Sequence, residues 1–426
     1  MKRALLVALL LLQTVILCAV PVDSCSTAFD AISADSNKRA GLDGLYPMRG
    51  VALTPAPRGY EPFYISHYGR HGSRYAFTDK VYLDPMSLLK RASAEGNITE
   101  EGQRLLDTLN ACWPRFKYRI GELTPLGWNQ QRYIGRTMVS SFPAVFGKAS
   151  IVDACSSPVR RAMMSMAACC MEIVRSAPRV SLYEHQGLLD IPATMPDSEE
   201  NPFRSERISA EAPFPLTADE LMSLRFPGYR QVLGRLFIDV DKAVEGVSAA
   251  RTLYWLNLIQ EGRLSVPEEQ KVPFFDALMT EDEQNGFWEV ANYIQYCSYF
   301  KSKEDCKAVV RDIIKKAENR ITEDFTGADL RFGHDHTLLA MLMDININGM
   351  GTIIPNAFDV PQWFRNYSCP MAANVQFVFY RPKRGKRDTI LFKVLLNGEE
   401  ARISDLQPLY GPYYKWTDFV SRFRDI

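Results

Sequence analysis

The sequence predicts an α/β fold with a mostly parallel sheet, because short apolar segments and helical segments alternate along the chain. Residues 63–66 form a compact apolar run between breaker residues, and residues 149–154 form a second one. Such runs are typical of buried strands. Each is followed by small residues and then by a helical pattern, and a repeated order of strand, loop and helix favours a parallel sheet.

The helices that follow these strands have recognisable starts and faces. Thr124 can cap a first helical turn and Pro125 fits the first helical position, so a helix is expected over residues 126–141. A second helix is expected beyond residue 158, because apolar side chains there recur at helical spacing and form one buried face: Met163, Met166, Ala167, Cys170 and Val174.

The α/β pattern is interrupted by residues 191–321, where Pro-rich coil gives way to helical segments with capping boxes. We expect this part to be a mostly helical cap, inserted into a discontinuous core of residues 25–190 and 322–426. The core pattern resumes with a strand over residues 328–333. Near the C-terminus, apolar runs on either side of the charged turn at residues 382–388 predict a β-hairpin.

The N-terminus has the features of an export signal. Basic residues at the start precede a short apolar run over residues 4–20, the pattern of a cleaved signal rather than of a permanent membrane span. We therefore expect residues 1–24 to be a signal peptide, and the mature protein to be periplasmic or extracellular without stable membrane insertion. An uncleaved anchor, or a lipid anchor on Cys18 or Cys25, is the alternative.

The composition is that of an ordinary globular protein. The 426 residues are 46% hydrophobic and 23% charged, and 50 acidic residues balance 50 basic ones. A chain of this length is expected to form two structural lobes. Because the net charge is zero, nothing in it favours nucleic acid or an anionic membrane as a partner, so any attraction for an anionic substrate must be local. The oligomeric state stays open.

The cysteines do not specify a disulfide pattern. Nine are present, and export would permit disulfides among those outside the signal. Cys297 and Cys306 are the first pair to test, whereas Cys169 and Cys170 can equally be small buried hydrophobic residues of a helix. No combination of cysteine and histidine has zinc-finger spacing.

The histidines indicate where the chemistry lies. Only five are present, and four of them fall in two tight clusters, His67 with His71 and His334 with His336, at the ends of predicted strands. The carboxyl ends of parallel strands are where α/β sheets place their ligands. His185 stands alone and is expected to be structural.

The loop after the first strand combines a histidine with fixed cations. Arg70 and Arg74 flank His71, and Gly72 allows a close approach of the backbone. Guanidinium groups match the charge and the acceptor oxygens of a phosphate monoester. Nearby cations also favour a neutral imidazole, which leaves a ring nitrogen free to attack phosphorus. A solvated basic turn would explain the arginines, but not the histidine and small residues directly after a strand.

Four segments resemble the motifs of the histidine acid phosphatases, the exported branch of the histidine phosphatase superfamily. Residues 70–74 resemble the R-H-G signature, and residues 123–127 resemble the L-T-x-x-G helix start. Residues 156–165 resemble the segment that supplies another phosphate-binding arginine, and residues 333–335 resemble the distal H-D pair. The segments come in the family's order and span nearly all of the chain after the signal.

This resemblance implies a three-layer α/β/α core like that of phosphoglycerate mutase, and hydrolysis of a phosphorylated small molecule without a metal or other cofactor. When residues 156–165 are aligned with the family's segment, Arg161 rather than Arg160 falls at the position of the phosphate-binding arginine. The implied site has His71 as the nucleophile that forms a phosphohistidine, Asp335 as the proton donor, and Arg70, Arg74, Arg161 and His334 around the phosphate.

Residues 330–339 also resemble the multiple inositol polyphosphate phosphatases and bacterial phytases of this group, which implies an inositol polyphosphate substrate. The inositol enzymes commonly have His, Ala and Glu where this chain has His334, Asp335 and His336, so His336 is the alternative proton donor. A substrate with many phosphates needs further cations, and the candidates, or else solvated surface charges, are Arg58, Lys80, Arg132 and Arg136.

Three alternatives stay open. The four clustered histidines could bind a metal, although converging arginines would repel a divalent cation. The fold of the superfamily would also allow mutase-type phosphoryl transfer, against which export and a large cap argue. A surface protein that binds phosphate esters with little turnover is the third alternative, against which the intact His71 and Asp335 argue.

Overall fold

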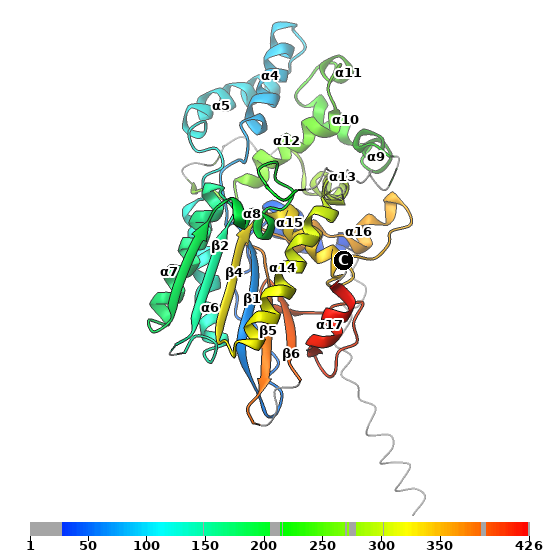
Figure 1. Cartoon of the computed structure of the whole chain (residues 1–426). Helices are drawn as coiled ribbons and strands as arrows, with labels where there is room; N and C mark the ends of the chain where they lie inside the picture. Colours follow the sequence, from blue (N-terminus) through cyan, green and yellow to red (C-terminus); the bar gives the residue numbers. More distant parts are fainter. Residues whose placement is uncertain are drawn as a thin grey trace, which may run out of the picture.

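A computed structural model describes residues 28–424, except 148, 205–213, 215, 269–270, 272–277, 301 and 385–388. Its centre is one sheet with the strand order β3-β2-β4-β1-β5-β6-β7, and β8 pairs with β6 (Figure 1). The strands are β1 (Tyr60–Arg70), β2 (Ile151–Ser156), β3 (Ser181–Gln186), β4 (Gly327–Gly333), β5 (Asn374–Pro382), β6 (Leu391–Leu396), β7 (Glu399–Ala401) and β8 (Tyr414–Lys415).

The sheet has a parallel half and an antiparallel half. Strands β3, β2, β4 and β1 pair in parallel, as the repeated order of strand and helix predicts. Strands β5, β6, β7 and β8 extend the sheet by antiparallel pairing from β1. The predicted C-terminal hairpin is confirmed as β5 and β6, while residues 385–388 of its turn lie outside the described residues.

Helices cover both faces of the sheet. On one face, α6 (Pro125–Ser141) and α7 (Arg160–Ser176) enclose a core with the strand residues Ile65, Val152 and Leu330. On the other face, α14 (Lys303–Thr322), α15 (Asp335–Asp344) and α17 (Trp416–Phe423) pack against residues such as Tyr64, Phe377 and Phe379. The predicted α/β/α layering is therefore confirmed, with α14 running across the front of the sheet in Figure 1.

The predicted start of α6 agrees with the structure, whereas Ser302 precedes α14 without the predicted side-chain cap. The side chain of Thr124 accepts a hydrogen bond from the backbone of Gly127, and Pro125 is the first residue of α6. The buried face of α7 is turned slightly from the predicted one, since Val174 is exposed and Ala162 and Ile173 are buried instead.

A helical lobe lies above the sheet in Figure 1 and has a hydrophobic cluster of its own. It contains α4 (Lys80–Ala94), α5 (Glu100–Phe116), α9 (Ala218–Arg225), α10 (Tyr229–Gly234), α11 (Val240–Ala243), α12 (Ala249–Gly262) and part of α13 (Glu281–Phe300). The short elements elsewhere are α2 (Ala28–Ala34), α3 (Ser36–Arg39), η1 (Gly41–Asp43), η2 (Leu188–Asp190), α8 (Ile191–Thr194), η5 (Ala357–Asp359), α16 (Val360–Trp363) and η6 (Asn366–Ser368).

Helix packing departs from the expected division into core and cap in two places. Helices α4 and α5 were expected in the core, but Leu88 and Leu89 of α4 join Leu253 and Leu256 of α12 in the helical lobe. Helix α14 was expected in the cap, but its apolar face packs on the sheet. In both cases the pattern shows which face is buried but not which neighbour covers it.

The structure describes most of the cysteines but not the N-terminal segment. Cys306 is a free thiol, so Cys297 and Cys306 do not form the disulfide that would have been tested first. Cys169 and Cys170 are buried, in keeping with small hydrophobic residues. The expected signal over residues 1–24 lies outside the described residues, as does Cys25. None of the helices described is long and apolar enough to cross a membrane.

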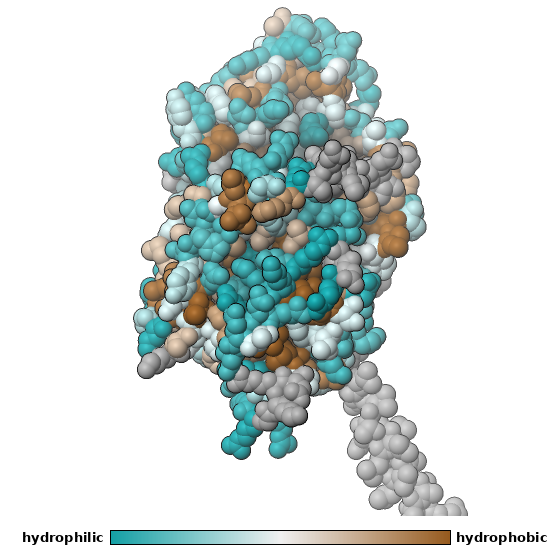
Figure 2. Space-filling model, viewed as in Figure 1, coloured by the Kyte–Doolittle hydropathy of each residue, from teal (hydrophilic) through white to brown (hydrophobic). Residues whose placement is uncertain are grey.

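The face of the molecule that carries α14 is mostly hydrophilic. Figure 2 shows its hydrophobic side chains in separate small patches between polar ones. The most exposed apolar residues of the described chain include Leu189, Phe203 and Ile353, which come from different segments.

Candidate active site

The parallel pairing of β1 with β4 places the two predicted histidine clusters next to each other. The last residues of these strands, Arg70 and Gly333, are partners in the register, so His71 and His334 follow side by side. The backbone N–H of His71 donates to the carbonyl of Gly333 at 3.1 Å. The centroids of the His71 and His334 rings are 5.6 Å apart, close enough for both to contact one small anion.

The loop that carries His71 packs directly against the start of α6, which explains the glycines in two of the predicted motifs. A Cβ on Gly72 would lie 2.4 Å from the carbonyl oxygen of Gly127, and a Cβ on Gly127 would lie 2.2 Å from that of Ser73. The hydroxyl of Thr124 donates to Ser73, and the Gly72 N–H donates to the Ser165 hydroxyl of α7. The loop is thereby fixed to both α6 and α7.

A hydrogen bond sets which nitrogen of His71 carries the proton. His71 Nδ1 lies 2.9 Å from the carbonyl oxygen of Gly72, which accepts only, so Nδ1 is protonated and Nε2 keeps its lone pair. His334 Nε2 lies 2.9 Å from the hydroxyl of Ser157. If that hydroxyl donates, His334 Nδ1–H becomes a donor for an anion. This arrangement suits a nucleophile next to a binding group.

Three arginines direct guanidinium groups to this place. Arg70 is fully buried, and its Nη1 donates to the carbonyls of Leu42 and Cys369. Within the described part of the chain, Arg70 Nε and Nη2, Arg74 Nε and Arg161 Nε are buried without a hydrogen-bond partner. Because buried donors are rarely left unpaired, these groups are suited to bind an anion with several acceptor oxygens.

Burial and the positive field of the arginines keep both histidines neutral. Burial, and then the charges of Arg161 and Arg70, hold the pKa of His71 well below its usual value. Burial and the charge of Arg161 do the same for His334. Burial lowers the pKa of Arg161 itself to about 10, with a further contribution from Arg74, so that it remains charged near neutral pH. The neutral imidazole expected from the sequence is therefore what the surroundings favour.

The carboxyl of Asp335 lies at the N-terminus of α15, directly after His334. Its Oδ2 accepts a hydrogen bond from the hydroxyl of Tyr299 at 2.9 Å and lies 3.8 Å from Arg70 Nη2. Burial alone would raise the pKa of Asp335, but Arg70, His336 and the Tyr299 hydrogen bond hold it well below its usual value. The carboxyl is therefore ionised before an anion neutralises the arginines.

The side chain of His336 lies parallel to that of His334, with ring centroids 5.4 Å apart and 5° between the planes. Its Nε2 lies 2.9 Å from Asp197 Oδ1. Burial lowers the pKa of His336, but the bond to Asp197 and the charge of Asp335 outweigh it and raise the pKa above the ordinary value. His336 therefore adds a positive charge next to a neutral His334.

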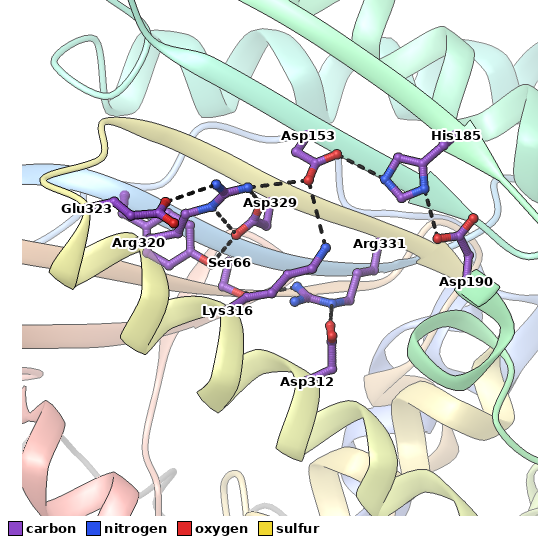
Figure 3. Close-up of polar contacts among 11 residues, drawn as sticks. Ser66, Asp153, His185, Asp190, Asp312, Lys316, Arg320, Glu323, Asp329 and Arg331 are labelled. Atoms are coloured by element: carbon purple, nitrogen blue, oxygen red, sulfur yellow. Dashed lines mark hydrogen bonds and ion pairs between the residues drawn. The ribbon is translucent and has the colours of Figure 1, made fainter. Parts of the chain in front are cut away.

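The other two histidines lie outside this cluster. His67 is buried in β1, where its ring packs against Phe332 with centroids 5.2 Å apart, and burial followed by the charge of Arg331 lowers its pKa to about 3. Figure 3 shows His185 of β3 between Asp153 and Asp190, at 3.0 and 2.8 Å. Both histidines are structural. The sequence predicted this role for His185 but not for His67.

Figure 3 also shows what anchors α14 to the sheet behind the site. The buried Arg331 of β4 binds Asp312 of α14 at 2.7 Å, and Arg320 of α14 binds Asp329 of β4 at 2.9 Å. These pairs fix the strand that precedes His334.

Three of the extra cations suggested by the sequence are engaged elsewhere or lie at the far end of β1. Arg132 and Arg136 of α6 both form ion pairs with Glu172 of α7. Arg58 precedes β1, at the opposite end of the strand from His71. Lys80 is an exposed residue at the start of α4.

Several contact residues had not been identified from the sequence. Asp43 lies 3.7 Å from Arg74, and burial raises its pKa against the pull of Arg74 and Arg70. Ser157 lies within residues 156–165, the segment that resembles a family motif, so that motif could have identified it. Asp197 and Tyr299 stand in segments without any motif, so no signal in the sequence indicated them.

The four-histidine metal site is not formed, because His67 packs into the sheet and His336 Nε2 is bound to Asp197. Among the residues described, no group of three or more His, Cys, Asp or Glu side chains is arranged to hold a metal ion. The donor set that does converge is cationic, and it is suited to an anion rather than to a divalent cation.

No protein-family model matches the chain, and no curated protein is similar to it in sequence. Solved structures do match. The multiple inositol polyphosphate phosphatase of Bifidobacterium longum, in complex with inositol hexasulfate, has a TM-score of 0.70 at 15% identity, and the match covers 91% of this chain and 97% of that one. The phytase from D. castellii has a TM-score of 0.64 at 13% identity, over 91% of this chain and 84% of that one.

The phytase from Citrobacter braakii is also similar, with a TM-score of 0.53 at 11% identity over 86% of this chain and 97% of that one. At such identities the likeness is one of fold, and it extends over most of the chain. The α/β/α fold of this chain is the fold of these inositol phosphate phosphatases.

Proposed function

We propose that this protein is a phosphatase of the histidine acid phosphatase type that hydrolyses phosphate monoesters, with inositol polyphosphates as its substrates. The observation that carries the proposal is a neutral His71, with its Nε2 lone pair available, beside His334 and among three arginines. Fixed cations around the phosphoryl oxygens stabilise the charge of the transition state, which is the main requirement of phosphoryl transfer.

In the first step, His71 Nε2 attacks phosphorus and the bond from phosphorus to the ester oxygen breaks. Asp335 donates a proton to that oxygen, which leaves as an alcohol, and a phosphohistidine is formed. The substrate makes this possible because its negative charge neutralises Arg70 and Arg74, two of the cations that hold the pKa of Asp335 low.

In the second step, the Asp335 carboxylate takes a proton from a water molecule, whose oxygen attacks phosphorus. The bond from phosphorus to His71 Nε2 breaks, inorganic phosphate leaves, and Asp335 is protonated again. Arg70, Arg74, Arg161 and His334 hold the phosphoryl oxygens in both steps, so the same cradle serves two transition states. His336 is the alternative acid, since it is positively charged next to the same site.

One finding supports an inositol polyphosphate as substrate. The structures with the same fold are a multiple inositol polyphosphate phosphatase, in complex with inositol hexasulfate, and a phytase.

Export is part of the proposal and rests on the N-terminal sequence alone. The basic start and the short apolar run of residues 4–20 favour secretion to the periplasm or the outside of the cell. A phosphatase there would act on phosphate esters from the surroundings. Detection of the mature protein outside the cytoplasm, with its N-terminus near residue 25, tests this part separately.

The test of the activity is phosphate release from inositol hexakisphosphate by the purified protein. His71→Ala should lower the rate by at least about 1,000-fold, because it removes the nucleophile. His185→Ala is the matched control, since it removes a histidine outside the site and should leave the rate unchanged. Mass spectrometry after an alkaline quench should find phosphate on residue 71 of the wild type.

Full activity of His71→Ala would contradict the proposal. Tight binding of inositol hexakisphosphate by the wild type without any phosphate release would favour a binding protein instead. Transfer of phosphate to a second phosphorylated acceptor without net release would favour a mutase.

A further inference from the structure

The hydroxyl of Tyr299 contacts the proposed acid directly. Tyr299 lies near the end of α13, is 7% exposed, and packs its ring against Phe364. Its hydroxyl donates to Asp335 Oδ2 at 2.9 Å. The helix that supplies it is separate in sequence from both strands of the site, so this contact joins a third segment to the catalytic constellation.

The two oxygens of Asp335 are held differently. Oδ2 accepts from Tyr299 and also lies 3.8 Å from Arg70 Nη2. A carboxyl oxygen that accepts a hydrogen bond and faces a guanidinium is the one that keeps the negative charge. The proton of the carboxyl therefore belongs on Oδ1.

Building on the proposed function, we propose that Tyr299 is a positioning residue for the proton transfer. Its hydroxyl fixes the carboxyl of Asp335 so that Oδ1 faces the reacting oxygen. In the first step the proton moves from Oδ1 to the leaving oxygen as the bond to phosphorus breaks. In the second step a proton of the attacking water moves to Oδ1. Tyr299 itself neither gains nor loses a proton.

The surroundings support this division of roles. Burial, and then the charge of Asp335, raise the pKa of Tyr299 well above its usual value, so its hydroxyl stays a donor throughout the working range. The other charged or titratable groups around Asp335 come from several elements and loops: Arg70, Arg74, His334, His336, Asp43, Arg161, Tyr254 and Cys369. Of these, Arg70, His336 and Arg74 lower the pKa of Asp335, as does the Tyr299 hydrogen bond.

The test compares Tyr299→Phe with Tyr293→Phe. Tyr293 lies on the same helix, and its hydroxyl donates to the carbonyl of Leu216 at 2.7 Å rather than to a site residue. Both changes remove one hydroxyl and keep the ring. Each variant is assayed on glycerol 2-phosphate, whose alkoxide must be protonated to leave, and on p-nitrophenyl phosphate, whose leaving group needs little protonation.

The expected result is a change in the ratio of the two rates. Tyr299→Phe should lower kcat/KM on the alkyl ester by about 10-fold and on the aryl ester by less than about 2-fold, because kcat/KM reports the first step, in which only proton transfer to the leaving group is disturbed. The ratio does not depend on the folded fraction, since both rates come from one preparation. The alkaline limb of kcat/KM should also move to higher pH, because the hydrogen bond that favours the carboxylate is lost.

Equal losses on both esters, or the same change of ratio in Tyr293→Phe, would overturn the inference. In an Asp335→Asn background, Tyr299→Phe should have no further effect on the ratio, since it acts through Asp335. If Asp335→Asn itself hydrolysed the alkyl ester at the wild-type rate, the proposed acid would be wrong. A change of ratio restricted to Tyr299→Phe in an otherwise active enzyme would support the positioning role.

Discussion

The ring of His334 stands edge-on to the ring of His71, with 5.6 Å between the centroids and 68° between the planes. The relationship follows from the pairing of two parallel strands whose last residues are partners in the register. It cannot be relaxed by a side-chain rotation alone, because each ring is held by a hydrogen bond of its own. A phosphoryl group between these rings would have the nucleophile on one side and a binding group on the other.

The first prediction concerns the choice between two adjacent arginines. Arg161 faces the site and its charge acts on His71 and His334, whereas Arg160 is exposed at the start of α7. Arg161→Ala should lower kcat/KM by roughly 100-fold, the usual effect of removing one donor from a charged transition state. Arg160→Ala is the matched control and should change it by less than about 2-fold. Equal effects would remove Arg161 from the site.

The second prediction concerns the packing of the loop that carries His71. Gly72→Ala would place a methyl group 2.4 Å from the carbonyl oxygen of Gly127. No side-chain rotation can relieve this contact, because the Cβ position and the carbonyl are both fixed by the backbone. We expect a loss of about 1–3 kcal/mol in the free energy of unfolding, as for other overpacked sites. Gly234→Ala is the control, because a Cβ there meets nothing within 4 Å. Urea unfolding of both variants gives the comparison, and similar stability of the two would contradict this account.

Gly72 and Gly127 both belong to segments that the sequence identifies, and other features of the fold can be predicted in the same way. The strands β1, β2 and β4 and the start of α6 could be predicted because each is encoded locally, by an apolar run or a cap. The proximity of His71 and His334 follows from these elements, since parallel strands end at the same edge of a sheet.

The rest could not be predicted, because it depends on which surfaces meet. Tyr299 reaches Asp335 only through the packing of α13 beside α15, and Asp197 reaches His336 from a turn after α8. Neither segment has a motif. The prediction that α4 belongs to the core is wrong for the same reason. The period of its apolar residues shows a buried face but not the partner of that face.

The third prediction is that removal of metal ions leaves the activity unchanged. Arg70, Arg74 and Arg161 surround the position where a metal would have to sit beside His71, and their charges disfavour a divalent cation there. Dialysis against a strong chelator, followed by assay in metal-free buffer, should give at least about 90% of the initial rate. A loss of rate that is restored by adding one divalent metal would revive the metal alternative.

The fourth prediction decides between the two candidate acids. Asp335→Asn should lower kcat on inositol hexakisphosphate by roughly 100-fold or more, as expected for loss of a general acid. His336→Gln should cost less than about 10-fold, because it removes a nearby charge and not the donor. The charge of His336 lowers the pKa of Asp335, so His336→Gln should also move the alkaline limb of the pH profile to higher pH. The opposite order of the two losses would assign the acid to His336.

The fifth prediction concerns the stability contributed by Asp197 and His336. The pKa of His336 is raised above 6.5 in the folded protein, so its stabilisation is complete below that pH and is lost as the pH rises through the folded value. The pKa of Asp197 is lowered from 3.8 against the effect of burial, so its contribution is present above that pH and is lost as the pH falls. The pair is therefore most stabilising between these two limits.

Asp197→Asn should accordingly cost about 1–2 kcal/mol of unfolding free energy near pH 5.5 and clearly less near pH 9, since hydrogen bonds between charged groups are worth that much when partly buried. The control is Asp190→Asn, which breaks a second carboxylate–histidine pair where His185 is 44% exposed, so screening by solvent should keep its effect small at both values. Urea titrations at the two pH values measure the difference. An equal loss at both would mean that Asp197 stabilises the fold without holding a charged His336, and that His334 is stacked on a neutral ring.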